Sequence, residues 1–234
     1  MSIAQNIAEL RQRVRVACTN AGRAEANVTI VAVSKTRPAG DIIEAYKCGI
    51  TDFGENRVDE LVRKRESVER EHPDVATAIR WHFIGHLQSK KCKDVLMSAD
   101  TIDSVDSLRL ARVLDKRAVE KEKQLDVLLQ VHISGEDQKY GIHEVELQSV
   151  VDEVRELPRL AVRGLMGMAS FTNDADVILR QFGSLQRLFR GLADAPPGSE
   201  LTTLSMGMSG DFELAIAMGA TEIRVGSLIF GSRG

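Results

Sequence analysis

The sequence predicts an α/β protein built as a single (β/α)8 barrel with an extra N-terminal helix. Eight short apolar segments alternate with eight helical segments, the last of them weak. The apolar segments are continuous runs, as expected for parallel strands that are covered on both faces. The chain has 234 residues, a length at which such barrels form one domain. A doubly wound open sheet is the alternative, but "VSKTRPAG" at 33–40 lacks the G-x-G-x-x-G motif that this fold expects after its first strand.

The extra helix is predicted from apolar residues that recur every three or four positions near the N-terminus. They are Ile3, Ile7, Leu10, Val14 and Ala17. A Ser2–Gln5 capping box would begin this helix, and Gly22 would end it.

The strands and helices then follow in strict alternation. The predicted strands are 28–34, 50–54, 79–85, 100–105, 125–133, 160–168, 201–207 and 222–226. The predicted helices are 38–49, 57–71, 87–98, 107–122, 143–156, 174–192, 211–219 and 227–233.

Composition excludes several classes of protein. The net charge is −3, so nothing indicates binding to nucleic acid or to a membrane surface. No apolar run approaches the ~20 residues that cross a bilayer, and the first ten residues lack an apolar signal core. Cys18, Cys48 and Cys92 lie far apart, without a CxxC pair. We therefore expect a cytosolic protein with no disulfide and no metal site.

Working residues of such barrels lie at the carboxyl ends of the strands. These ends are predicted at Lys35, Asn56, His82, Asp103, His132, Met166, Ser205, and Arg224 with Gly226. Lys35 is notable because it follows a buried strand whose apolar neighbours oppose its charge. Burial favours the neutral amine, which is the form that attacks a carbonyl. The alternative is a lysine at the barrel end that pairs with a carboxylate.

The loops after the last two strands have the composition of a phosphate site. "SMGMSGD" at 205–211 and "RVGS" at 224–227 are rich in small residues, so that backbone N–H groups can approach a ligand closely. The alternative is that these glycines only permit tight turns. A reactive lysine opposite a phosphate cradle fits a phosphorylated aldehyde, and pyridoxal 5′-phosphate (PLP) is the obvious candidate.

Seven motifs give the chain a resemblance to a known family. They are "AVSKT" at 32–36, "FGEN" at 53–56, "WHFIGHLQSKK" at 81–91, "SVDS" at 104–107, "GLMGM" at 164–168, "SMGMSGD" at 205–211 and "IRVGSLIFG" at 223–231. In this combination the chain resembles the pyridoxal phosphate homeostasis protein family, whose barrel is similar to the N-terminal domain of alanine racemase. The resemblance covers nearly the whole chain and implies one PLP-binding domain over residues 1–234.

The resemblance also implies a set of ligand contacts. PLP would be a Schiff base on Lys35, and Arg224 would contact the pyridine nitrogen. Ser205, Gly226 and Ser227 would hold the phosphate, and Asn56 would lie beside the ring. Two positions depart from the family pattern: His132 and Lys90 stand where relatives usually have Asn.

Arg224 and the tyrosines bear on whether the protein is an enzyme. A guanidinium only donates hydrogen bonds, so Arg224 would keep the ring nitrogen unprotonated and disfavour aminotransferase chemistry. A racemase needs a second acid/base. Tyr46 is expected on an outer helix and Tyr140 in an exposed loop. We therefore expect no catalytic residue.

The function favoured by these observations is a monomeric protein that buffers, protects or delivers PLP, with PLP-dependent apoenzymes as possible recipients. The alternatives are a weak PLP-dependent amino-acid racemase and a barrel that acts on a sugar phosphate.

Two further features have ordinary explanations. His82 and His86 are four residues apart, but a glycine lies between them and no third ligand is evident, so we expect no metal there. Lys90, Lys91 and Lys93 surround Cys92. They would either activate its thiol or simply form a solvated helix face with it, and the solvated face is favoured.

Overall fold

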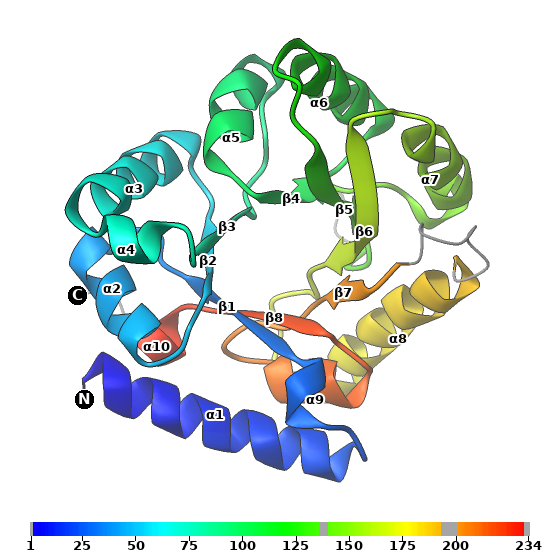
Figure 1. Ribbon diagram of the computed structural model, residues 1–234. Coiled ribbons are helices and arrows are strands. Elements are labelled where there is room, and N and C mark those ends of the chain that lie inside the picture. Colours follow the sequence, from blue (N-terminus) through cyan, green and yellow to red (C-terminus); the bar gives the residue numbers. More distant parts are fainter. Residues whose placement is uncertain (1, 136–139, 193–200, 232–234) are drawn as a thin grey trace.

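A computed structural model describes residues 2–135, 140–192 and 201–231. Eight parallel strands pair in chain order, and β8 pairs with β1 to close a barrel (Figure 1). The strands are β1 (Thr29–Val33), β2 (Asp52–Glu55), β3 (Arg80–Phe83), β4 (Thr101–Val105), β5 (Leu125–Val131), β6 (Leu160–Gly167), β7 (Thr203–Ser205) and β8 (Glu222–Val225). The predicted (β/α)8 fold is confirmed.

Helices surround this ring of strands (Figure 1). The α-helices are α1 (Ile3–Asn20), α2 (Ala39–Lys47), α3 (Val58–Glu71), α4 (Pro73–Ala76), α5 (Cys92–Ser98), α6 (Leu108–Glu120), α7 (Leu147–Arg155), α8 (Ala175–Gly191), α9 (Phe212–Ala217) and α10 (Ser227–Phe230). Short 3-10 turns are η1 (Glu25–Asn27), η2 (Ser89–Lys91) and η3 (Glu144–Glu146). No helix within the described ranges is long and apolar enough to cross a membrane.

The extra N-terminal helix forms as predicted. The Ser2 hydroxyl accepts from Gln5 N–H, and the Gln5 side chain accepts from Ser2 N–H, which completes the capping box. Its buried stripe includes Ile7, Leu10 and Val14 and packs against α2, α9 and α10 outside the barrel (Figure 1). Asn6 adds a hydrogen bond of 2.8 Å from its Nδ2 to Ile229 O.

The main core lies between the strands and the surrounding helices. It holds the largest fully buried side chains, among them Phe53, Trp81, Phe83, Phe182 and Phe212. Burial of each such side chain stabilises the fold by about 1.5–3 kcal/mol. The alternate strand positions face the barrel interior. In register, Thr29 lies opposite Glu222 and Val31 opposite Arg224, so the interior is built in layers along its axis.

Three details differ from the predicted elements. The short helix α4 was not predicted, and its Pro73 stands at the first helical position. The predicted helix 87–98 divides into η2 and α5. The last predicted helix ends early, at Phe230, because Gly231 adopts a positive φ of 81°.

Candidate functional site

Lys35 lies two residues beyond β1, at the carboxyl-end mouth of the barrel. Its side chain is partly buried. No hydrogen bond or ion pair from the described residues engages its amine. Within the described residues, Lys35 therefore does not pair with a carboxylate, which was the alternative. Its amine is available to a ligand.

A second lysine forms ion pairs with the carboxylates near the turn that carries Lys35. Lys64 of α3 is 7% exposed, and its Nζ lies 2.6 Å from Glu55 Oε1 and 2.8 Å from Glu60 Oε1. It also donates to Ser34 O at 2.6 Å. Burial raises the pKa of Glu55, although Lys64 and a 2.6 Å hydrogen bond from the Ser34 hydroxyl oppose that shift. No sequence signal pointed to this cluster, because α3 carries charges of both signs, as exposed outer helices do.

The same cluster fixes the backbone on both sides of Lys35. Lys64 and Glu55 hold Ser34, and Glu60 Oε1 accepts from the N–H of Thr36. Thr36 has a φ of 66°, a left-handed conformation that is costly for a β-branched residue. The turn that carries Lys35 is thus held in a strained conformation by buried charges.

Asn56 follows β2 directly and is exposed at the same mouth. The backbone of the next loop approaches it closely, because a Cβ at Gly85 would collide with the Asn56 carbonyl oxygen. Only glycine fits at position 85, and this close approach fixes where Asn56 presents its side chain.

The loops after β7 and β8 form the small-residue turns that the sequence predicted. Gly207 has a φ of 94°, and a Cβ there would lie 2.5 Å from Ala215 Cβ. Asp211 closes this loop by accepting from Met208 N–H at 2.5 Å. Gly226 caps α10, and a Cβ on it would lie 3.1 Å from Val33 O on β1. Ser227, the next residue, is exposed.

Arg224 lies one interior layer below Gly226 and is 4% exposed. Its Nη1 donates to Ser205 Oγ at 2.5 Å, and its Nη2 donates to Gly167 O at 3.0 Å. Ser205 Oγ in turn donates to Glu222 Oε1 at 2.6 Å. Burial lowers the pKa of Arg224, and Glu222 opposes that shift. The Ser205 hydroxyl is therefore committed to the barrel interior, between two charged side chains.

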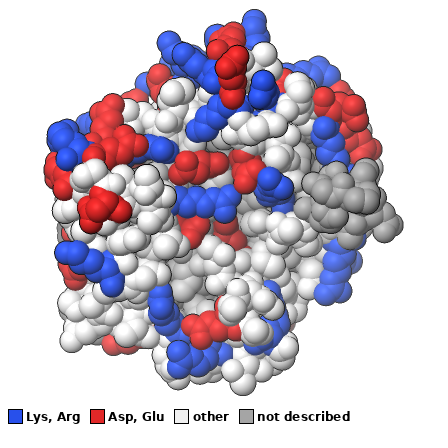
Figure 2. All heavy atoms as spheres, in the orientation of Figure 1, with Lys and Arg blue, Asp and Glu red and all other residues white. Residues whose placement is uncertain are grey.

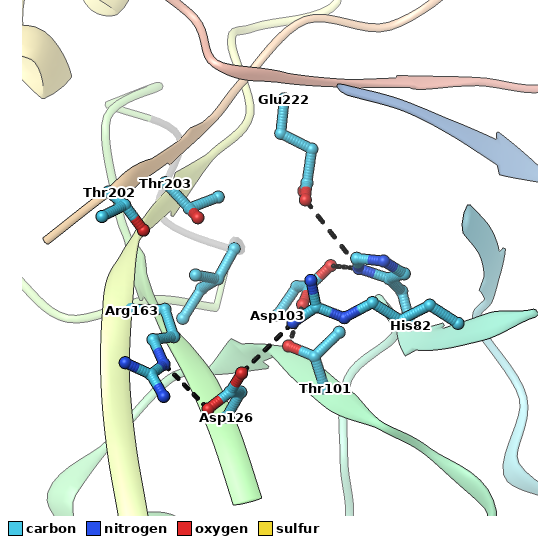
Figure 3. Close-up of a pocket in the computed structure, with 10 residues that line it drawn as sticks. His82, Thr101, Asp103, Asp126, Arg163, Thr202, Thr203 and Glu222 are labelled. Atoms are coloured by element: carbon cyan, nitrogen blue, oxygen red, sulfur yellow. Dashed lines mark hydrogen bonds and ion pairs between the residues drawn. The ribbon is translucent and has the colours of Figure 1, made fainter. Parts of the chain in front are cut away.

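His82 and Asp103 correct the expected list of strand ends. Both side chains face the interior from within β3 and β4 and lie near the amino-end mouth, in a cavity that Thr101 and Glu222 also line (Figure 3). The error arose because both residues were taken as strand ends, whereas β3 continues to Phe83 and β4 to Val105.

Charged side chains of both signs gather at the centre of the face in Figure 2, over the barrel.

The two ring nitrogens of His82 each contact a carboxylate. Nδ1 lies 2.9 Å from Asp103 Oδ2, and Nε2 lies 3.0 Å from Asp52 Oδ1. Burial alone would lower the pKa of His82, but the carboxylates, Asp103 first, raise it to about 10. Burial also pushes the pKa of Asp52 upward, yet the hydrogen bond from His82 leaves it below its usual range. His82 is an imidazolium that donates from both nitrogens.

Asp52 and Glu222 were not singled out from the sequence, although a signal was present. A charged residue inside a buried parallel strand is rare, because burial of an unpaired charge is costly. "TDFGE", "RWHF", "TIDS" and "EIRV" each contain at least one. Asp52, His82, Asp103 and Glu222 could therefore have been paired as an interior cluster.

His132 follows β5 at the carboxyl-end mouth, as predicted. Its Nε2 is buried without a hydrogen bond from any described residue, and its ring meets that of His143 edge-on at 5.5 Å. An orphaned buried nitrogen at this mouth is the kind of group that a polar ligand satisfies.

Cys92 and Tyr140 occupy settings that limit their reactivity. Cys92 is fully buried, and burial raises the pKa of its thiol to about 11. Cys92 is therefore neither an activated thiol nor part of a solvated helix face, the two alternatives considered from the sequence. Tyr140 is 56% exposed and its ring stacks on that of His86 at 3.6 Å. The loop 134–141 that contains it falls partly outside the described residues.

Comparison with known proteins agrees with the barrel fold. Residues 3–234 match the family model "Alanine racemase, N-terminal domain". A relative from Pasteurella multocida, named pyridoxal phosphate homeostasis protein, is 39% identical over 100% of this chain and 98% of its own length.

Two solved structures are similar throughout. A protein of unknown function from Bifidobacterium adolescentis is 37% identical, with a TM-score of 0.91, over 97% of this chain and 94% of its own. PipY of Synechococcus elongatus, solved with PLP bound, is 35% identical, with a TM-score of 0.84, over 98% of this chain and 100% of its own.

Proposed function

The chain belongs to the pyridoxal phosphate homeostasis protein family, and from this membership we propose that it binds PLP and buffers, protects or delivers it with little or no turnover. The observation that carries the proposal is the state of Lys35. Glu55 and Glu60, near the turn after β1, both form ion pairs with Lys64. The amine of Lys35 therefore has no partner among the described residues. A lysine held on a rigid turn and left unpaired is positioned for a carbonyl ligand.

The residues at the carboxyl-end mouth fit such a ligand. PLP, when bound, supplies an aldehyde for a lysine amine and a conjugated ring that can withdraw electrons. Lys35 would hold the aldehyde end. The family resemblance gives the phosphate to Gly226 and Ser227, and the absence of a side chain at 226 would let the backbone of this turn approach a ligand closely. Asn56 would lie beside the ring.

Arg224 would face the pyridine nitrogen as a hydrogen-bond donor. Its guanidinium is already oriented by Ser205 Oγ and Gly167 O. The family resemblance implies that Ser205 contacts the phosphate. The Ser205 hydroxyl, however, is hydrogen-bonded to Arg224 and Glu222. We therefore propose that Ser205 supports the site chiefly by holding Arg224. The orphaned His132 Nε2 offers one further polar contact.

The same residues support a carrier over an enzyme. The Arg224 guanidinium only donates hydrogen bonds, so it would not stabilise a protonated ring nitrogen, and the electron sink would be weak. A racemase also needs an acid/base within hydrogen-bond reach of the substrate. Tyr140 is exposed and stacked on His86, and Tyr46 packs in α2 on the outer layer. Weak amino-acid racemase activity remains the alternative that experiment must decide.

The location and partners are part of the proposal. We propose that it binds neither nucleic acid nor a membrane surface, because the charges nearly balance. We also propose that it is a cytoplasmic monomer. PLP-dependent apoenzymes that lack their cofactor would be the recipients.

The decisive experiment is absorbance with borohydride trapping. The full chain incubated with PLP should absorb near the visible range, and reduction should fix the adduct on the peptide that contains Lys35. Lys35→Ala should abolish this fixed adduct. Lys90→Ala, which removes an exposed lysine of η2, should leave it unchanged. A colourless mixture, or an adduct spread over many lysines, would refute the proposal.

Turnover distinguishes the carrier from the racemase. The PLP-loaded chain is incubated with L-alanine or L-serine and the D-enantiomer is measured. We expect none above the rate of free PLP. Formation that disappears in Lys35→Ala would assign the racemase instead.

A further inference from the structure

The cavity at the amino-end mouth has no part in the proposed function. Its volume is about 210 Å³, and its walls carry Thr101, Asp126, Thr203 and the buried His82–Asp103–Glu222 cluster (Figure 3). The carboxyl-end site lies at the other mouth of the barrel. A polar cavity that opens onto three buried ionisable side chains requires its own account.

The three clustered side chains have the spacing of metal ligands. One donor atom from each of His82, Asp103 and Glu222 lies within 4.8 Å of the others, and all three residues are buried. His82 Nδ1 is 2.9 Å from Asp103 Oδ2 and 3.9 Å from Glu222 Oε2. A cation bonded at about 2.0–2.2 Å to imidazole and carboxylate ligands needs neighbouring donors about 3–3.5 Å apart, so small adjustments suffice.

A second observation points to a missing ligand. Glu222 is 5% exposed, and its Oε1 accepts from Ser205. Its Oε2 faces His82 at 3.9 Å, which is beyond hydrogen-bond distance, and accepts no hydrogen bond from the described chain (Figure 3). Glu222 lines the cavity, so this oxygen is available to a cation bound there.

The outer contacts hold each donor atom in place. His82 Nε2 bonds Asp52 Oδ1 at 3.0 Å, the carboxylate–histidine arrangement that orients metal-bound imidazoles. Thr101 donates to Asp103 Oδ1 at 2.9 Å, which leaves Oδ2 for the ligand position. With the Ser205 bond to Glu222, all three donors are preorganised by their other atoms.

We propose that His82 Nδ1, Asp103 and Glu222 bind a divalent transition-metal ion such as Zn²⁺, with water in the cavity completing the coordination. This departs from the expectation of no metal site. On binding, the metal replaces the proton on His82 Nδ1, and that proton is released to solvent. One nitrogen and two oxygens favour Zn²⁺ or Mn²⁺ over Mg²⁺, which prefers oxygen ligands alone.

The surrounding charges leave room for this cation. The carboxylates of Asp52, Asp103 and Glu222 outnumber the buried cation Arg224. Burial raises the pKa of Glu222, and a cation in the cavity would favour its ionised form. At the rim, Asp126 holds both cationic side chains: its Oδ2 is 3.2 Å from Arg80 Nη2, and its Oδ1 is 2.8 Å from Arg163 Nε. With neutral His82, a divalent cation brings the buried group to neutrality.

Metal uptake by the full chain without PLP tests the site. After treatment with a chelator, the chain is titrated with Zn²⁺ against a chromophoric competitor. We expect about one equivalent bound, with Mg²⁺ at least tenfold weaker. Glu222→Gln and Asp103→Asn should each weaken Zn²⁺ at least tenfold. Thr203→Val, which lines the same cavity without supplying a ligand, should change it less than twofold. Unaltered binding in Glu222→Gln would overturn the proposal.

Nuclear magnetic resonance of the unmodified chain keeps the test valid if a variant fails to fold. Without metal, both ring N–H protons of His82 should be protected and visible. Saturating Zn²⁺ should remove the Nδ1 proton and retain the Nε2 proton. If both protons persist, or if Zn²⁺ binds only exposed histidines, the proposal is wrong.

Discussion

The two mouths of the barrel use charge in opposite ways. At the carboxyl end, the carboxylates Glu55 and Glu60 share Lys64 behind the strands, and Lys35 in front has no partner among the described residues. At the amino end, the charges lie inside the barrel, with His82 held between Asp52 and Asp103. Paired charge behind a site makes it rigid and keeps it open for a ligand. Paired charge within a barrel fills the interior. It stabilises the fold, and it can also bind a cation.

The largest expected effect is at the amino-end mouth. Asp103→Ala removes a fully buried carboxylate from an imidazolium and should lower the free energy of unfolding by about 3–5 kcal/mol. Asp126→Ala at the rim of the same cavity, where the ion pairs are solvated, should cost below about 1 kcal/mol. Urea unfolding measures both. Equal costs would mean that interior and rim charges do not differ.

Lys64→Met tests the carboxyl-end mouth. It leaves buried Glu55 without its cation and should cost about 3 kcal/mol in unfolding free energy. It should also slow PLP capture, because Ser34 and Thr36 lose their anchors beside Lys35. Lys91→Met, which breaks an exposed pair with Asp59, should have little measurable effect on either property. Normal capture in a folded Lys64→Met chain would show that the cluster only stabilises.

The pH dependence of stability, measured with a chelator present, reports on His82. Its folded pKa of about 10 lies above the unfolded value of about 6.5. The stabilisation is therefore complete below about pH 6.5 and is lost as the pH rises through about 10, with a slope of at most about 1.4 kcal/mol per pH unit. His82→Gln should flatten this slope. An identical slope in the two proteins would contradict an imidazolium at this position.

The smallest effect is at Ser205, which joins the two regions. Ser205→Ala removes the hydroxyl between Arg224 and Glu222 and should cost about 1–2 kcal/mol, because both charged groups lose a buried partner. It should also weaken PLP binding by loosening Arg224. The exposed Ser227→Ala should leave unfolding unchanged. Unchanged PLP affinity in a folded Ser205→Ala chain would contradict the proposed role of this hydroxyl in holding Arg224.

Much of the fold could be predicted because apolar runs and turn residues are local signals. All eight strands and the Ser2–Gln5 capping box were found in this way. Lys35 and the glycine-rich loops were also identified, since they follow strands whose ends sequence can place within a few residues. The short helix α4 was missed because four residues give no periodic pattern.

The interior clusters could not be derived in the same way. His82 and Asp103 were placed at the wrong mouth because the height of a side chain in the barrel depends on how each strand is staggered against its neighbours. Lys64 was overlooked because its partners Glu55 and Ser34 come from two other elements. Such pairings depend on register, which the sequence of one chain specifies only indirectly.

The shortness of β7 has a dynamic consequence. β5 and β6 pair along nearly their whole length, whereas β7 meets β8 in register only at Ser205 and Glu222. A few bonds, such as Met206 N–H to Glu222 O at 3.1 Å, extend that seam. Transient opening of the barrel should therefore begin between these two strands, and amide protons there should exchange with deuterium sooner than those of β5.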